Sequence, residues 1–240
     1  MLRFFRKIRQ QLLGEGSIRK YLIYAIGEIL LVMIGILLAL QVSIWNQNVI
    51  KKQKEIKLLK ELRLSLEASD RHFQSTLKES KKILKAKELV IDFFENDQVW
   101  EDSLQQYFNQ FFLLQDYNID ETAFRSLESW GIDKLSNDTL REQISHLYNN
   151  RSEHLSNLEK NEMEMWWGGY HNDVTTLFDF GAPKMKPYDD ANSIQIENYV
   201  KKEKLFKTII AYNNNRYSSI QRSIQRLEKH TAIEIERLSN

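Results

Sequence analysis

Hydrophobic and polar residues are segregated along the chain, and one continuous apolar stretch stands near its start. From Tyr21 to Trp45 the chain reads YLIYAIGEILLVMIGILLALQVSIW. About 25 residues at a rise of about 1.5 Å each give roughly 37 Å, enough to cross a hydrocarbon core of about 30 Å with some tilt. Tyr21, Tyr24 and Trp45 stand at its ends, where interfacial aromatic residues are expected. The stretch predicts a transmembrane helix over 21–45.

A cleaved signal peptide is the alternative interpretation of this stretch. The apolar core of a signal peptide spans about 7–15 residues and ends in a small-residue cleavage site. The apolar run here is longer and has no such site. We therefore expect the segment to be retained as an anchor.

Beyond the apolar stretch, apolar residues recur at alternating steps of three and four, which is typical of a helix of coiled-coil type. The first series has a gap near Lys87 and contains two serines. Its members are Leu59, Leu62, Leu66, Ser69, Phe73, Leu77, Ser80, Leu84, Ile91 and Phe94. The series predicts a stalk helix over 46–96.

Residues 97–240 are expected to form a helical bundle domain that packs with the stalk. A short amphipathic piece spans 104–114, and a second helix has Asp120 as its predicted N-cap and ends at Trp130, before Gly131. Asn137 or Ser136 then caps a long helix, whose predicted buried positions are Leu140, Ile144, Leu147, Arg151, Leu155, Leu158, Glu162 and Met165.

The long helix is expected to be interrupted at Gly168 and Gly169, and 183–190 reads as a loop. The last helix begins near Asn198. Its predicted buried positions are Phe206, Ile209, Asn213, Tyr217, Ile220, Ile224, Leu227, Thr231, Ile235 and Leu238. The fold class is therefore all-α, with one N-terminal transmembrane helix followed by a bundle of long helices.

Composition narrows the functional classes. The chain has 240 residues, only two prolines and eight glycines, and a formal net charge of +1. A charge so close to zero gives no overall basic field for nucleic acid. The lack of cysteine excludes a disulfide framework, thiolate zinc sites and thiol nucleophiles.

The positive charge is concentrated before the apolar stretch, which predicts a basic amphipathic cytoplasmic tail over 1–20. Apolar and basic residues alternate at helical spacing here, so the tail can lie on anionic lipid; the contact residues would be Arg3, Phe4, Phe5, Arg6, Lys7 and Arg9. The alternative is a disordered tail that only sets orientation. Arg19 and Lys20 touch the apolar stretch, whereas Lys51 stands six residues past Trp45, which favours a cytoplasmic N-terminus and a periplasmic C-terminal domain.

Glu28 is an acidic residue within the apolar stretch, and small residues share its side of the helix. Gly35 and Ala39 fall within about 20° of Glu28 at 100° per residue, and Ser43 continues the line. Small residues let two helices approach closely, and a carboxyl group can hydrogen-bond across. Glu28, Gly35, Ala39 and Ser43 are thus a predicted association face. Alternatively, Glu28 lies shallow and its side chain reaches the interface.

No pattern in the chain indicates catalysis, a metal or another cofactor. HExxH, GxSxG and phosphate-binding glycine loops are absent. Glu142 and His146 lie one helical turn apart, but His146 and His154 differ by about 80° around a helix and do not converge. The string Trp166-Trp167-Gly168-Gly169 is either a packed helix corner or a ligand contact at a helix break.

Several segments resemble an uncharacterised family of small single-span membrane proteins of Gram-negative bacteria. They are FFRKIR (4–9), YAIGEI (24–29), IGILLALQ (34–41), Trp45-Asn46 and, more loosely, AFRSLESWGIDKLSNDTLREQISHLY (123–148). The family has no assigned activity, so the resemblance implies an anchor in the inner membrane and supplies no functional residue.

Two functions remain open from the sequence. The first is a membrane-anchored, non-enzymatic scaffold or protein-interaction protein whose partners are the lipid bilayer and either a second copy or another membrane protein. The alternative is an extracytoplasmic helical bundle that senses an unknown small molecule and signals through a partner protein. A deep polar cavity would favour sensing, and a filled core with an exposed apolar patch would favour the scaffold.

Overall fold

The computed structural model describes residues 18–96, 104, 107, 116–179, 186–187 and 193–240. Most of the predicted short piece over 104–114 lies outside this set, as do the side chains of Tyr21 and Tyr24. The predicted lipid-surface residues also lie outside it: Arg3, Phe4, Phe5, Arg6, Lys7 and Arg9. Helices account for nearly all of the described residues, so the prediction of an all-α fold is confirmed.

The chain divides into two compact units, Met1–Glu55 and Ile56–Asn240. Helix α2 (Ile18–Glu95) contributes to both. The boundary between the units falls inside the predicted stalk over 46–96. Helix α2 ends one residue before Asn96, where the sequence predicts a break.

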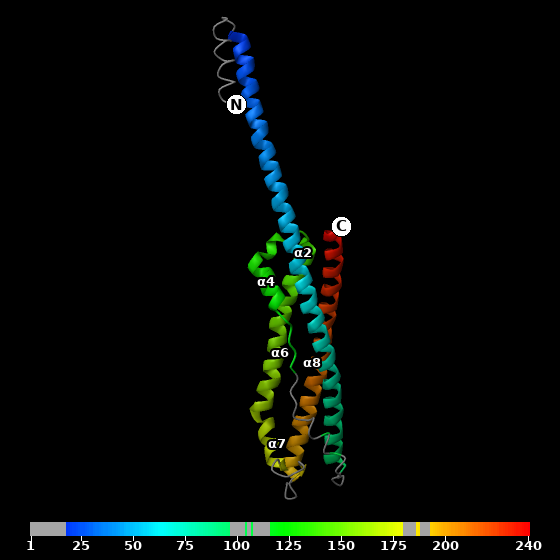
Figure 1. The fold of residues 1–240 in the computed structure, drawn as a ribbon. Coiled ribbons are helices and arrows are strands. Elements are labelled where there is room, and N and C mark those ends of the chain that lie inside the picture. The colour runs from blue at the N-terminus through cyan, green and yellow to red at the C-terminus, as the bar shows by residue number, and fades with distance from the viewer. Residues whose placement is uncertain (1–17, 97–103, 105–106, 108–115, 180–185, 188–192) are drawn as a thin grey trace. The chain divides into compact units, whose positions relative to one another are not determined.

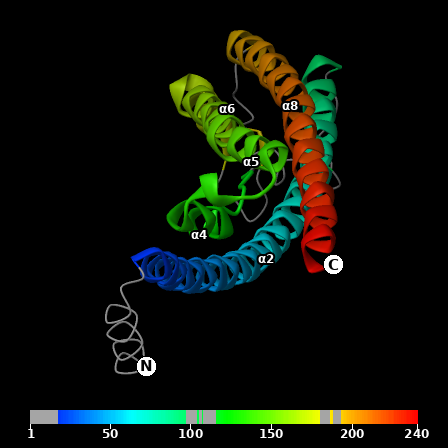
Figure 2. The same ribbon diagram turned by 90° about the horizontal axis from the view of Figure 1, so that it is seen from above.

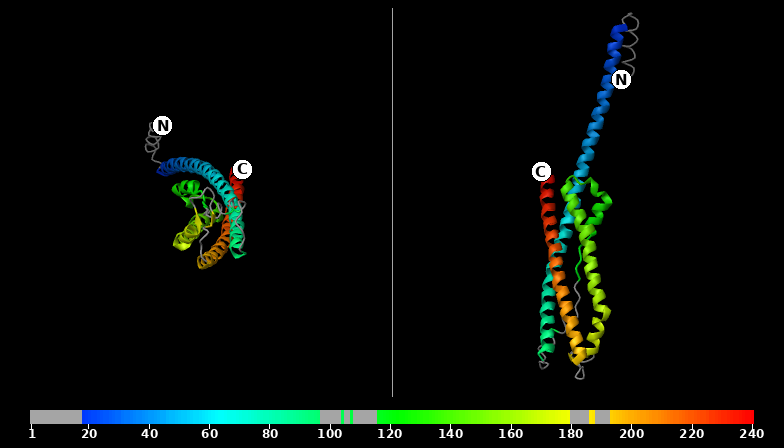
Figure 3. Two further views of the ribbon diagram at one scale, coloured as in Figure 1. Left: turned by 90° about the horizontal axis from the view of Figure 1, so that it is seen from below. Right: turned by 180° about the vertical axis from the view of Figure 1, so that it is seen from behind.

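In the second unit, helix α8 (Ser193–Ser239) runs alongside the 56–95 part of α2 (Figures 1 and 3). The other side of α8 contacts α5 (Asp138–Ser145), α6 (Ser152–Met165) and α7 (His171–Leu177). Figure 2, which looks along these helices, shows α8 flanked by α2 and by α5 and α6. The arrangement is a bundle of helices around shared buried faces.

Short elements connect the long helices. Helix α4 (Thr122–Trp130) is followed by the 3-10 turn η2 (Ile132–Lys134). Two π-helical segments, η3 (His146–Arg151) and η4 (Trp166–Tyr170), interrupt the predicted long helix at both ends of α6. Strands β1 (Phe178–Asp179) and β2 (Lys186–Pro187) pair antiparallel, with Phe178 opposite Pro187. Strand β2 lies within the region predicted as loop, 183–190, and β1 precedes that region.

The predicted ends of α4 and α5 follow from their capping residues. Gly131 ends α4 at a φ of 105°, and an added Cβ would lie 2.9 Å from Asp133 Oδ1, so glycine suits this position. The Asn137 side chain accepts the backbone N–H of Leu140 and caps α5 as predicted. The prediction of Asp120 as the N-cap of α4 was wrong by one residue: the cap is Glu121, and Asp120 Oδ1 accepts the Thr122 N–H at 2.9 Å.

Buried positions on α8 keep steps of three and four along the described helix. They are Tyr199, Glu203, Phe206, Ile210, Asn213, Tyr217, Ile220, Ile224, Leu227, Thr231, Glu234 and Leu238, and Val200 is buried in addition beside Tyr199. Two predicted positions are displaced by one residue: Ile209 and Ile235 are half-buried, and Ile210 and Glu234 are buried instead. The helix also begins at Ser193, five residues before Asn198, because its first turns continue past the buried face and include the exposed Ile194.

Among the described residues, the buried apolar side chains form two clusters. The larger cluster joins α2, α4, α5, α6 and α8 and includes the fully buried Leu62, Ile144 and Ile220. The smaller cluster joins the end of α2 to η4, α7 and the start of α8, and it includes Tyr170 and Phe206. Both clusters belong to the second unit.

We expect Leu62→Ala to lower the free energy of unfolding by about 2–5 kcal/mol, because Leu62 is fully buried and truncation leaves a cavity. The matched control is Leu64→Ala on the same helix, where the side chain is 65% exposed; its effect should stay within about 0.5 kcal/mol. Denaturant unfolding of the full chain in detergent micelles, followed by circular dichroism, measures both. Equal losses in the two variants would contradict the assignment of this helix face to the core.

Candidate functional site

The apolar part of α2 lies in the first unit, and its side chains are exposed. Leu31 and Trp45 are 66% and 68% exposed, and the neighbouring leucines and isoleucines are similar. This helix includes a window with a mean hydropathy of 2.4, none of which is buried. By length and composition it is a helix that can cross a membrane.

The predicted association face is open in the structure. A Cβ added at Gly35 would meet no atom within 4 Å, and Ala39 is exposed. Ser43 Oγ accepts the Gln47 side-chain amide at 3.4 Å, one turn further on. Glu28 is half-buried among more exposed neighbours. The helix therefore offers space for a close neighbour beside Gly35, and association through this face stays a prediction.

Lys87 occupies the gap in the first apolar series and is completely buried. Its Nζ donates to Glu203 Oε1 at 3.1 Å, and both side chains are 0% exposed. Tyr170 donates its hydroxyl to the other oxygen of Glu203. The Lys87 ammonium also lies 4.5 Å from the centre of the Phe206 ring. The pair thus connects α2, η4 and α8 inside the smaller core cluster.

Desolvation dominates the electrostatics of this pair. Burial lowers the pKa of Lys87 and raises the pKa of Glu203, although each charge favours the ionised form of the other. Burial also raises the pKa of Tyr170 well above its ordinary value, which keeps its hydroxyl protonated as a donor. A charge without its partner here would be costly, because the surroundings are apolar.

The Trp166–Gly169 string forms a packed helix corner. Trp166 is 7% exposed, and its ring lies 5.1 Å from that of Tyr170 and 6.3 Å from that of Phe206. Gly169 has a φ of 131°, which bends the chain between α6 and α7. Trp167 is 62% exposed, and its Nε1 donates to Met163 Sδ. The corner supplies Tyr170 to the Lys87–Glu203 pair.

A second buried polar group lies within the larger cluster, at Glu162 of α6. Its Oε1 accepts the Asn213 amide at 2.6 Å and the Tyr217 hydroxyl at 3.2 Å. Tyr117 stacks on Tyr217, with 3.6 Å between ring centres. Burial raises the pKa of Glu162, partly offset by the two hydrogen bonds. Asn213 and Glu162 were both predicted at buried positions.

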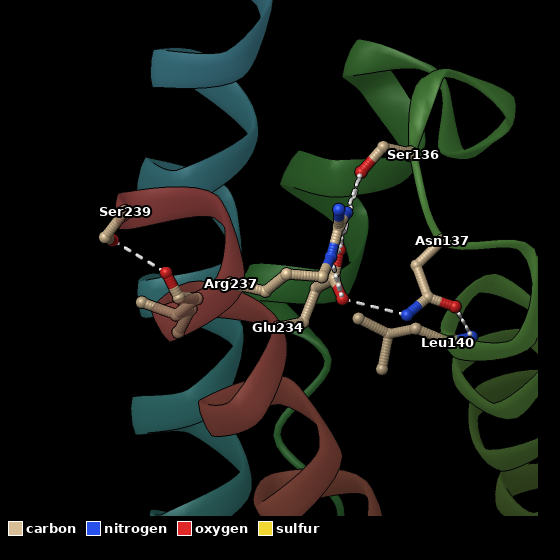
Figure 4. Close-up of polar contacts among 7 residues, drawn as sticks. Ser136, Asn137, Leu140, Glu234, Arg237 and Ser239 are labelled. Atoms are coloured by element: carbon tan, nitrogen blue, oxygen red, sulfur yellow. Dashed lines mark hydrogen bonds and ion pairs between the residues drawn. The ribbon is translucent and has the colours of Figure 1, made fainter.

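The end of α8 is fixed to the start of α5 by a third polar group, centred on the buried Glu234 (Figure 4). Its Oε2 accepts the Asn137 amide at 2.9 Å, and Arg237 donates to both of its carboxylate oxygens. These contacts lower the pKa of Glu234, with Arg237 as the largest cause. Asn137 thus caps α5 with its oxygen and binds α8 with its nitrogen.

Histidines do not form a metal site within the described ranges, where no group of three or more His, Cys, Asp or Glu residues could hold an ion. His72 contacts the Asp116 carbonyl at 3.0 Å, and His230 Nδ1 contacts Gln143 Oε1 at 2.6 Å. His146 and His230, from distant parts of the sequence, line one groove together. Sequence spacing could not predict that both histidines line one groove, because the two residues belong to different helical elements.

No protein-family model, curated protein or solved structure matches this chain. The resemblance to single-span proteins of Gram-negative bacteria therefore stays a prediction.

Lys87→Met is expected to lower the free energy of unfolding by about 3–5 kcal/mol, because it leaves Glu203 buried without its cation. Adding Glu203→Met should recover most of that loss, since an apolar pair replaces the charged one. The control is Lys207→Met, which breaks the more exposed pair of Lys207 with Glu88 and should cost about 0–1 kcal/mol. Chemical unfolding of the four proteins gives the comparison, and a double variant no more stable than Lys87→Met would refute the pairing argument.

Proposed function

We propose that the chain is a single-pass membrane protein with a non-enzymatic helical domain that acts as a scaffold or protein-interaction module. The observation that carries the proposal is the exposed apolar part of α2, none of which is buried over a window of mean hydropathy 2.4. In water, each Å² of such surface costs about 25 cal/mol relative to burial. Soluble monomers rarely expose continuous apolar surface of this extent. Lipid removes the cost.

The orientation we propose places the N-terminus in the cytoplasm and the second unit outside it, at the inner membrane. Arg19 and Lys20 directly precede the apolar stretch, whereas the lysines that begin at Lys51 stand further from it. Basic residues close to a span favour the cytoplasmic side, and long C-terminal domains cross largely regardless of their charge.

The proposed partners are lipid and either a second copy of the chain or another membrane protein. The face of Glu28, Gly35, Ala39 and Ser43 supports helix association, because space beside Gly35 permits close approach. A non-enzymatic role is part of the proposal because the sequence carries no catalytic motif and the described buried carboxylates bind neighbouring side chains. A groove of the second unit between α8 and the stretch of α5 and η3 favours the sensing alternative.

The anchor and its orientation are tested by fusing a reporter that is active only outside the cytoplasm after Asn240. The fusion should be active, and the intact chain should stay with membranes in alkaline carbonate. Leu31→Arg combined with Leu38→Arg should abolish both results, because each arginine costs about 2.5–3.5 kcal/mol at the centre of a span. Leu64→Arg, at an exposed position of the second unit, is the control and should change neither.

Three outcomes count against this proposal. A stable but inactive fusion reverses the orientation. A freely soluble intact chain removes the anchor. A mature chain that begins after Trp45, determined by intact mass, shows that the segment is a cleaved signal.

The association face is tested by disulfide crosslinking in membranes, which is simplified because the chain has no cysteine. Ala39→Cys should crosslink, and Leu37→Cys, about 160° away around the helix, should not. Adding Glu28→Leu or Gly35→Ile should weaken the Ala39→Cys crosslink, by about 1–2 kcal/mol for loss of the interhelical carboxyl contact. Equal crosslinking at both cysteines, or no effect of the added changes, would exclude this face.

A further inference from the structure

A groove of about 560 Å³ lies in the second unit between α8 and the continuous stretch of α5 and η3. The buried Leu147 and Leu227 provide apolar lining from the two sides. Its volume lies within the range of about 300–1,000 Å³ that is usual for small-molecule sites. The groove is therefore large enough for a small organic ligand.

Positive charge predominates among the groove's lining residues. Arg151 comes from η3 and Arg226 from α8, and Glu142 is the one carboxylate among the lining residues. Neither arginine has an ion pair with a described residue. An anion in the groove would therefore meet two guanidinium groups and one carboxylate among the lining residues.

Arg151 has a buried donor that the described residues leave unsatisfied. Its Nε is buried and has no hydrogen-bond partner among them. A buried donor without an acceptor costs about 1–3 kcal/mol, and more when the group is charged. An acceptor supplied by a ligand would remove this cost.

Part of one side of the groove, the segment η3, is π-helical, and Arg151 is its last residue. Single π turns are uncommon and occur frequently at functional sites. Across the groove, His230 donates its Nδ1–H to Gln143 Oε1 at 2.6 Å, because an amide oxygen can only accept. This contact orients the His230 ring beside the groove.

We propose that this groove binds a small organic carboxylate, with the carboxylate held by Arg151 and Arg226 and the apolar part against Leu147 and Leu227. A planar guanidinium matches the two oxygens of a carboxylate. The apolar lining and Glu142 disfavour a compact dianion such as phosphate. The proposal goes beyond membrane anchoring and does not depend on it.

The test titrates the full chain in detergent micelles, with leucine methyl groups labelled for NMR. The probes are benzoate, glutarate and glutamate, with benzamide as a neutral analogue and inorganic phosphate as a compact anion. At least one carboxylate should saturate shifts of the Leu147 and Leu227 methyl signals at millimolar concentration, and benzamide should not. If no carboxylate saturates these signals, or if benzamide or phosphate binds as tightly as the best carboxylate, the proposal is overturned.

Three variants assign the binding to the groove. Arg151→Met should weaken the best carboxylate about tenfold or more. Arg222→Met, an exposed arginine one turn before Arg226 and outside the lining, should leave binding unchanged. Glu142→Gln should tighten binding severalfold, because it removes the repelling carboxylate without changing shape. Wild-type affinity in Arg151→Met or weaker binding in Glu142→Gln would each refute the site, and the second result remains decisive if Arg151→Met does not fold.

Discussion

Buried charge inside a narrow helical interface has to be paired, and that requirement sets the alignment of α2 with α8. Lys87 and Glu203 are both completely buried and can satisfy each other only at one relative position of the two helices. A slip of seven residues would keep the apolar pattern but place Lys87 opposite Ile196 or Ile210. The apolar contacts alone would tolerate such a slip far better than the charge does.

Local signals in the sequence predicted much of this architecture. Gly131 and Asn137 act through one or two backbone hydrogen bonds, so their roles can be read from neighbouring residues. From Phe206 onward the buried face of α8 was predicted from spacing, except where two adjacent residues compete, as at Ile209 and Ile210. The buried Tyr199 and Glu203 before it were not predicted. The charged pair was missed because lysine at a buried position reads as a gap in the pattern. Its partner lies 116 residues away.

Helix α2 belongs to two compact units and has a different surface in each. In the first unit its apolar side chains are exposed, and in the second unit Leu62 and its neighbours are buried by other helices. Apolar side chains of the same types are therefore exposed in one part of the helix and buried in a protein core in the other. The sequence marks the change through spacing, because the continuous apolar run gives way to apolar residues separated by charges.

The polar contacts of α2 with α8 form a series in which the residue numbers run in opposite directions. Arg63 contacts Glu228, Glu88 contacts Lys207, and Glu95 contacts Lys204. Two antiparallel helices joined in this way overlap side by side, and their contacts are distributed along the overlap. A tensile force that slides one helix past the other loads these contacts simultaneously, in shear. A force that separates the helices from one end breaks the contacts in succession, so the mechanical strength of the pair depends on the direction of pulling.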